Sequence, residues 1–189
     1  MVEIDVRQLT EGDDARRVMV LPGSAYPVEL PGLAFPVRAL ELQGWQVWGA
    51  RWDLSVLESR EERRRAVEHA LDRFADTTQA VPGLVLAKSV GTLAAEWTAD
   101  RGVPAVWTTP LLTDAGCAAA IGRSPAPALL VAGDRDFAWD AEAARESGKT
   151  VCLLSGPDHG WRTGDWGAEF DALRTMTGAI ARFAESLVD

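Results

Sequence analysis

Side chains that can act as nucleophile, acid and base stand just after short apolar runs of this 189-residue sequence. Ser89 follows the run at 83–88, Asp134 and Asp136 follow the run at 128–132, and His159 lies in the loop after 150–154. A serine hydroxyl is a weak nucleophile until a base removes its proton, and a histidine base needs a carboxylate to orient it. A serine, a histidine and a carboxylate that follow predicted strands therefore indicate nucleophilic catalysis.

The segment Ala87-Lys88-Ser89-Val90-Gly91 has the composition of a sharp turn between a strand and a helix. Ala87 and Gly91 are small, and such a turn needs small neighbours because strand, turn and helix approach one another closely. The turn would lift the Ser89 hydroxyl above the sheet and direct a helix N-terminus at developing negative charge. The alternative interpretation of Ser89 is an ordinary helix N-cap.

Lys88-Ser89 is also similar to the end of a phosphate-binding P-loop, G-x-x-x-x-G-K-[ST]. The two glycines of that motif would fall at Pro82 and Ala87. Pro82 has no amide hydrogen to offer a phosphate, and Ala87 lacks the conformational freedom of glycine. The residues therefore argue against a phosphate cradle.

The elements that must position these side chains follow an alternating pattern. Nearly continuous apolar character is typical of strands buried on both faces of a mostly parallel sheet, and it predicts strands at 2–9, 16–21, 45–51, 83–88, 104–108, 128–132 and 150–154. Only residues 10–14 separate the first two strands, which predicts an antiparallel hairpin. The expected fold is an α/β three-layer sandwich, with about seven strands and helices on both faces, as a single domain over 1–189.

Amphipathic stretches between the strands predict the helices. Ser55-Val56-Leu57-Glu58 has the pattern of a capping box that opens a helix towards Thr78. Further helices are expected at 93–101 and 139–147, and the final helix has Asp165 as its N-cap. Apolar residues recur at three- and four-residue spacing along that last helix, and they are Trp166, Phe170, Leu173, Ile180, Phe183 and Leu187.

Taken together, these segments resemble the α/β-hydrolase superfamily, whose nucleophile elbow is G-x-S-x-G. Here Ala87 stands in place of the first glycine, and the superfamily's chain order of serine, acid and histidine is kept. Asp136 fits the acid of a post-strand G-x-x-D loop, with Asp134 shaping the turn. The resemblance implies His159 as the base, because it lies in a Gly/Pro loop before the final helix. The other histidine, His69, is predicted to be a surface residue.

The resemblance also implies where the oxyanion of an acyl-transfer reaction is held. One donor is the backbone N–H of Val90, the residue after the nucleophile. The second comes from the loop Pro22-Gly23-Ser24-Ala25, with Ser24 as the expected donor and Ala25 as the fallback. Relatives often have His-Gly at the start of this loop, whereas this chain has Pro-Gly.

The interval 109–127 has space for one short helix but not for a lid, so the resemblance is closest to small capless, dienelactone-hydrolase-like members. True dienelactone hydrolases use a cysteine nucleophile, so their specific activity does not carry over. An open site is expected, with substrate-contacting side chains from the surrounding loops, and these are Tyr26, Trp52, Trp139 and Trp161. The implied function is a serine esterase acting on a small acyl substrate, with no metal and no organic cofactor.

Net charge and the length of the apolar runs limit the kinds of partner that this chain is expected to bind. The net charge of −9 repels phosphate backbones, so nucleic acid is not an expected partner. The apolar runs are shorter than the ~18 residues of a membrane span, and the acidic start Met1-Val2-Glu3 is unlike a secretory signal. A cytoplasmic monomer or homodimer is expected, with Cys117 and Cys152 as free thiols.

Two alternatives stay open. Asp134-Arg135-Asp136 after an apolar strand is similar to the haloacid-dehalogenase phosphatases, in which the first aspartate is the nucleophile beside Mg²⁺. Their pattern needs Thr or Val where this chain has Ala138, and it normally follows the first strand of the fold. The second alternative is a hydrolase-fold protein that binds a ligand or a partner with little or no turnover.

Overall fold

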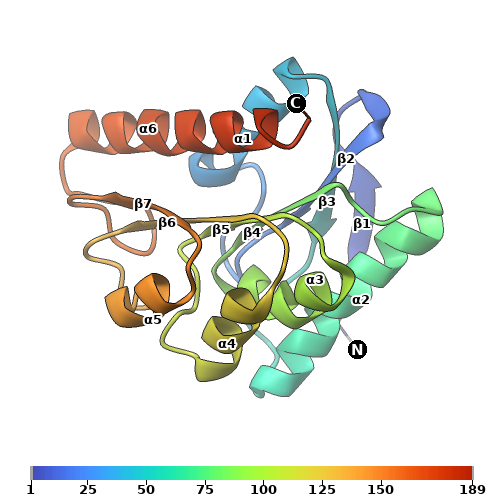
Figure 1. The fold of residues 1–189 in the computed structure, drawn as a ribbon, viewed down its shortest axis with the longest axis horizontal. Coiled ribbons are helices and arrows are strands. Elements are labelled where there is room, and N and C mark those ends of the chain that lie inside the picture. Colours follow the sequence, from blue (N-terminus) through green and yellow to red (C-terminus); the bar gives the residue numbers. More distant parts are fainter. Residues whose placement is uncertain (1, 189) are drawn as a thin grey trace.

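The computed structural model describes residues 2–188 and contains one seven-stranded sheet between two layers of helices (Figure 1). The strand order is β1-β3-β2-β4-β5-β6-β7, and every pair is parallel except β1–β3. The predicted mostly parallel sheet is confirmed. The strands are β1 (Asp5–Gln8), β2 (Asp13–Leu21), β3 (Trp45–Arg51), β4 (Leu84–Lys88), β5 (Ala105–Thr108), β6 (Ala128–Gly133) and β7 (Thr150–Leu154).

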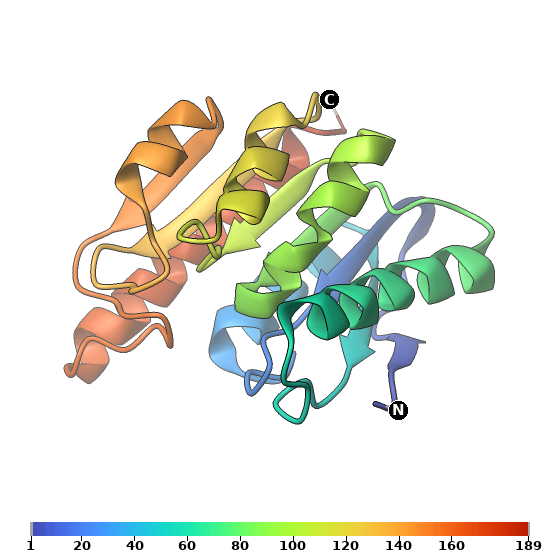
Figure 2. The same cartoon turned by 90° about the horizontal axis from the view of Figure 1, so that it is seen from below.

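Helices cover both faces of the sheet, as a three-layer sandwich requires. Figure 1 shows α1 and α6 on one face and α2 to α5 on the other, and Figure 2 looks onto the second group. The helices are α1 (Pro31–Leu42), α2 (Arg60–Thr78), α3 (Ala95–Arg101), α4 (Ala115–Arg123), α5 (Ala141–Glu146) and α6 (Trp166–Glu185), with the 3₁₀ helix η1 (Ser89–Ala94) between β4 and α3.

The alternation of side chains along a strand divides the core into two parts. On β2, Met19 and Leu21 belong to the core shared with α2, α3 and α4, whereas Val18 and Val20 belong to the core under α1 and α6. All four side chains are fully buried. Because both faces of the central strands are covered, their sequences are nearly continuous apolar runs.

The predicted antiparallel pair is present, but its partner differs from the prediction. β1 pairs with β3, not with β2, so the hairpin between the first two strands is wrong. The short connection passes over the start of β3, where Leu9 N–H donates to Val47 O and Asp13 N–H to Gly44 O. A Cβ on Gly12 would lie 2.4 Å from the Gln46 nitrogen, so the crossing needs a glycine. Both edges of β2 are occupied by parallel neighbours.

The capping box of α2 lies four residues later than predicted. Ser59, not Ser55, is the N-cap: its side chain accepts from Glu62 N–H, and the Glu62 carboxylate accepts from Ser59 N–H. The Ser55 hydroxyl instead donates to Asp53 in the preceding turn. The N-cap predicted for the last helix is confirmed, since Asp165 accepts from Ala168 N–H.

Few of the remaining segments depart from expectation. In α6, Leu173 and Ile180 are buried, but Trp166 and Phe170 are exposed and pack edge-to-face on each other.

The interval 109–127 contains α4 alone and no lid, and Cys117 and Cys152 are free thiols. Over residues 2–188, no helix has both the length and the apolar character needed to cross a bilayer.

Candidate active site

Ser89 stands on a strained turn at the carboxyl end of β4. Its φ of 52° lies in the left-handed region, where a residue with a side chain is uncommon. The chain turns directly from β4 into η1 at this residue. A Cβ on Gly91 would lie 2.8 Å from the Leu21 carbonyl oxygen and 3.1 Å from the Ala87 Cβ, so the two small residues permit this close approach.

The structure brings Ser89, His159 and Asp136 together although they are distant in sequence. Ser89 Oγ lies 2.7 Å from His159 Nε2, and His159 Nδ1 lies 2.7 Å from Asp136 Oδ1. The neighbours of each ring nitrogen favour an Nδ1–H that donates to Asp136 and an Nε2 that accepts from the Ser89 hydroxyl. A hydroxyl, an imidazole and a carboxylate in this arrangement can activate the hydroxyl as a nucleophile.

The Asp136 carboxylate is shielded from water. The Asp136 side chain is fully buried, whereas one fifth of the His159 side chain is exposed. Asp136 Oδ1 also accepts from Ala138 N–H at 2.9 Å, which holds the carboxylate in place. His159 therefore has a fixed partner on its inner side and remains open to solvent on its outer side.

Asp134, two residues earlier, is exposed and has a different role in the same loop. It accepts from Gly156 N–H at 2.8 Å and from the Ser155 hydroxyl at 3.0 Å, which ties the loop after β6 to the loop after β7. These hydrogen bonds, first that from Gly156, lower the pKa of Asp134. Asp134 therefore shapes the loops, as expected from the sequence. His69 is exposed on α2, also as expected.

The loop after β2 supplies candidate oxyanion donors. Gly23 N–H donates to Tyr26 O at 3.1 Å and closes a turn over Ser24 and Ala25. Across residues 2–188, the amides of Ser24 and Ala25 donate to no protein acceptor. A Cβ on Gly23 would lie 3.7 Å from the Ser89 Cβ, so this turn adjoins Ser89. Val90 is in the first turn of η1, whose N–H groups have no acceptor within a helix.

Lys88, Thr109 and Phe137 also adjoin the site and were not foreseen from the sequence. Lys88 Nζ donates to Thr109 Oγ1 at 2.8 Å and to the His159 carbonyl oxygen at 2.7 Å. Burial lowers the pKa of Lys88 to about 7, against the opposing effects of Asp136 and Asp158. The Phe137 ring lies against the His159 ring. The only sign of their involvement in the sequence is that Lys88 precedes Ser89 and Phe137 follows Asp136.

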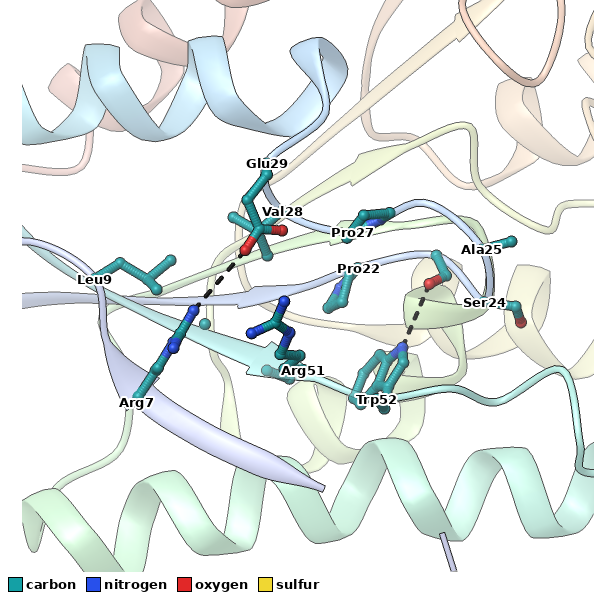
Figure 3. A pocket seen from close by; sticks show the side chains of 13 residues that line it. Arg7, Leu9, Pro22, Ser24, Ala25, Pro27, Val28, Glu29, Arg51 and Trp52 are labelled. Atoms are coloured by element: carbon teal, nitrogen blue, oxygen red, sulfur yellow. Dashed lines mark hydrogen bonds and ion pairs between the residues drawn. The ribbon is translucent and has the colours of Figure 1, made fainter. Parts of the chain in front are cut away.

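A cavity of about 200 Å³ adjoins the Gly23 turn, and Ser89 is not among the residues that line it. Figure 3 shows Arg7 and Arg51 rising from β1 and β3 towards the segment that carries Pro27 and Glu29. Ser24 and Ala25 line the cavity with Trp52, whose indole N–H donates to Gly23 O at 3.4 Å. Its walls are mainly apolar, and they include Leu9, Pro22, Pro27 and Val28.

The four predicted substrate-contacting residues lie in four different surroundings. Trp52 lines the cavity described above. Tyr26 accepts from Gly32 N–H at 2.9 Å, and its ring lies 4.6 Å from the Lys88 ammonium, so it holds the loop in place. Trp139 is half-buried against the core under α2 to α5. Trp161 is only 2% exposed and packs in the opposite core. As a wall of an open site, Trp161 is therefore a wrong prediction, because its loop folds inward onto α1.

Comparisons with known proteins identify the fold. Est1E from Butyrivibrio proteoclasticus, solved with ferulic acid bound, superposes with a TM-score of 0.75 at 13% identity, over 99% of this chain and 96% of that one. A lidless α/β serine hydrolase from Xanthomonas campestris gives 0.66 at 16% identity, covering 96% and 87%. An esterase domain from Rhodothermus marinus gives 0.64 at 15% identity, covering 97% and 99%.

Sequence-level comparisons contribute nothing further. No protein-family model matches the chain, and no curated protein matches it. The structural likeness extends over nearly the whole chain, so the chain has the α/β-hydrolase fold without a lid.

Proposed function

We propose that this chain is a serine hydrolase that cleaves small carboxylic esters through Ser89, His159 and Asp136. The observation that carries the proposal is the pair of 2.7 Å contacts that links the three side chains. The left-handed φ of Ser89 supports it, since a strained backbone at a nucleophile is typical of this kind of turn. Neighbours of the same fold described as a serine hydrolase and as an esterase domain support hydrolytic chemistry.

In the acylation half-reaction, His159 Nε2 takes the Ser89 proton as Oγ attacks the ester carbonyl carbon. The C=O π electrons move to oxygen, and the backbone amides of Val90 and Ser24, with Ala25 as the fallback, stabilise this oxyanion. Each such donor contributes a factor of about 10²–10³ in rate. Asp136 stabilises the imidazolium and keeps Nε2 directed at the reacting atoms. Collapse of the intermediate breaks the C–O bond, and the imidazolium gives its proton to the departing alkoxide.

In the deacylation half-reaction, a water molecule takes the place of the alcohol. His159 removes a proton from water, the hydroxide attacks the acyl carbon, and the carbonyl oxygen again carries the charge. Collapse releases the carboxylic acid and returns the proton to Ser89 Oγ. Because the exposed part of His159 faces solvent, water can reach the acyl-enzyme.

Two features favour small esters over amides or large substrates. An alkoxide leaves more readily than an amide nitrogen, and a lidless site offers little enclosure to distort an amide. The cavity of about 200 Å³ is mainly apolar and is lined by Ser24 and Ala25 of the turn that carries the candidate oxyanion donors, so a short acyl or alcohol group bound at that turn would extend into it. Tyr26, Trp52 and Trp139 remain candidates for substrate contact on this proposal.

The direct test is intact-mass labelling with a fluorophosphonate. We expect one adduct on the native chain and none on Ser89→Ala or His159→Ala. Asp136→Asn should label about 10³–10⁴-fold more slowly, because the histidine tautomer is then wrong for proton removal. His69→Ala and Ser186→Ala, which change an exposed histidine and an exposed serine, are matched controls and should label like the native chain. A series of p-nitrophenyl esters should then show a preference for short acyl chains.

A ligand-binding protein without turnover is the second candidate. The observation in its favour is that the cavity beside the Gly23 turn is lined by none of the three triad side chains. A folded native chain that takes no fluorophosphonate would contradict the hydrolase proposal and favour this candidate. The open site gives the probe no steric obstacle.

A further inference from the structure

Lys88 is a buried cation that the proposed mechanism does not use. Its side chain is 1% exposed, one residue before the nucleophile. Within residues 2–188, no carboxylate forms an ion pair with its ammonium group. A lysine buried without a paired carboxylate is rare, because desolvating the charge is costly. Such a group needs a reason to be there, and its contacts indicate one.

The Lys88 ammonium joins segments from three other parts of the chain. Its hydrogen bonds go to the Thr109 hydroxyl, just after β5, and to the His159 carbonyl oxygen in the loop after β7. The Tyr26 ring, in the turn that carries the candidate oxyanion donors, lies 4.6 Å away. Lys88 Nζ therefore contacts both the His159 loop and the Tyr26 turn, and Lys88 itself is next to Ser89 in sequence.

The backbone around these contacts is strained, and the contacts help to hold it in that conformation. Among the described residues, four non-glycine residues have positive φ, and three of them are close to Lys88 in sequence or by contact: Ser89 at 52°, Thr109 at 46° and Trp161 at 67°. Thr109 binds Lys88 directly, and Trp161 is two residues beyond His159. Backbone in sparsely populated regions persists only when surrounding interactions hold it there.

We infer that Lys88 is a positioning residue, which fixes the main chain of His159 relative to Ser89 and to the Tyr26 turn. Lys88 contacts the backbone of His159, through its carbonyl oxygen, whereas Asp136 contacts the imidazole ring. This inference rests on the proposed function, because the position of His159 matters for rate only if His159 is the base. The hydrogen-bond geometry itself can be tested without any activity.

The variant that isolates this role is Lys88→Met, which keeps the length of the side chain but removes its charge and its N–H donors. Val85→Ala is the matched control. Val85 is fully buried on the same strand and belongs to the core under α2 to α5, whereas Trp161 of the histidine loop packs in the opposite core. Truncating it lowers stability without touching the histidine loop. Comparison of the two variants separates loss of stability from loss of position.

Two measurements are made on each folded variant. The first is the second-order rate constant for fluorophosphonate labelling, and the second is the low-field proton NMR signal of the imidazole Nδ1–H bonded to Asp136. The chain has two histidines, and His69 is exposed, so its ring protons exchange with water and do not interfere. We expect Lys88→Met to label at least tenfold more slowly and to broaden or lose the signal. Val85→Ala should keep the native values of both.

Native labelling and a native Nδ1–H signal in Lys88→Met would overturn the inference and leave Lys88 as a buried structural residue. Should Lys88→Met fail to fold, Thr109→Val removes one acceptor of the ammonium group and should slow labelling by about threefold or more; a native rate and signal would overturn the inference. If the native chain does not label at all, the proposed function fails. Loss of the NMR signal in Lys88→Met would still support the positioning of His159.

Discussion

The ring of Phe137 packs against the imidazole of His159, with 4.5 Å between ring centroids and 38° between ring planes. Phe137 is nevertheless 76% exposed, so an apolar side chain lies beside His159 at the mouth of the site. The face of an aromatic ring attracts a cation, and at exposed sites the attraction is about 0.5–1 kcal/mol. Phe137 should therefore favour the imidazolium that forms when His159 takes the Ser89 proton.

Phe137→Leu keeps an apolar cover over His159 but removes the π face. Because the imidazolium that forms during attack by Ser89 loses this stabilisation, labelling should slow by about two- to fivefold, which is the rate equivalent of about 0.5–1 kcal/mol. The measurement is the second-order rate constant of fluorophosphonate labelling. Phe137→Tyr, which keeps an aromatic ring, should label at the native rate. A native rate in the leucine variant would contradict the role assigned to the ring.

Gly91→Ala tests the close packing of the nucleophile turn. The added Cβ would lie 2.8 Å from a backbone oxygen, that of Leu21, which cannot move without shifting β2. We expect a loss of about 1–3 kcal/mol in the free energy of unfolding, as for other overpacked sites, measured by urea denaturation. Gly122→Ala is the control, since its added Cβ comes no closer than 3.6 Å to Ser147 and alanine is a good helix former. Equal stability of Gly91→Ala and the native chain would show that the turn is not tight.

Ser89→Ala and Ser89→Gly both remove the hydroxyl, so the difference in stability between them should report the backbone strain at this position. At a φ of 52° alanine keeps the steric cost of the left-handed region, whereas glycine does not. Glycine is also more flexible in the unfolded chain, which offsets part of the gain. The net expectation is that Ser89→Gly is more stable than Ser89→Ala by about 0.5–1 kcal/mol. Thermal unfolding of the two variants measures the difference, and a more stable alanine variant would contradict the strained turn.

Lys88 should make stability depend on pH in a predictable direction. Burial lowers its pKa from 10.5 to about 7 in the folded chain. Below about pH 7 both states are protonated and the folded state bears the full desolvation cost. Between about pH 7 and 10.5 the unfolded chain holds more protons than the folded chain, so stability rises with pH.

Lys88→Met lacks this titration, and its stability relative to the native chain should therefore fall as the pH rises. The slope has an upper bound of about 1.4 kcal/mol per pH unit. Urea unfolding of both proteins at several values between about pH 6 and 9 measures the slope, and the difference between the proteins cancels the other titrating groups. A difference that is constant with pH would show that Lys88 keeps its ordinary pKa in the folded state.

Local residue types were sufficient to predict the elements and the order of the candidate site residues. Two strands, β3 and β7, have the predicted bounds, and the others differ mainly at their ends. These predictions succeed because apolar runs, small turn residues and N-caps act over neighbouring positions. The candidate triad could be named in advance because parallel strands place their carboxyl ends, and the loops that follow, at one edge of the sheet, and because these loops resemble the nucleophile, acid and base loops of the α/β-hydrolases.

Tertiary structure alone decided the features that join distant residues. β1 pairs with β3 because both edges of β2 are taken, and no local pattern states which strands become neighbours. The burial of Trp161 against α1 joins segments that are distant in sequence. Ser55 and Ser59 each have a glutamate three residues later, so the sequence pattern allowed either serine as the cap of α2. The contact from Lys88 to His159 spans 71 positions. A buried lysine can satisfy its donors only with groups that the folded chain brings to it, so its role becomes visible only once the loops are assembled.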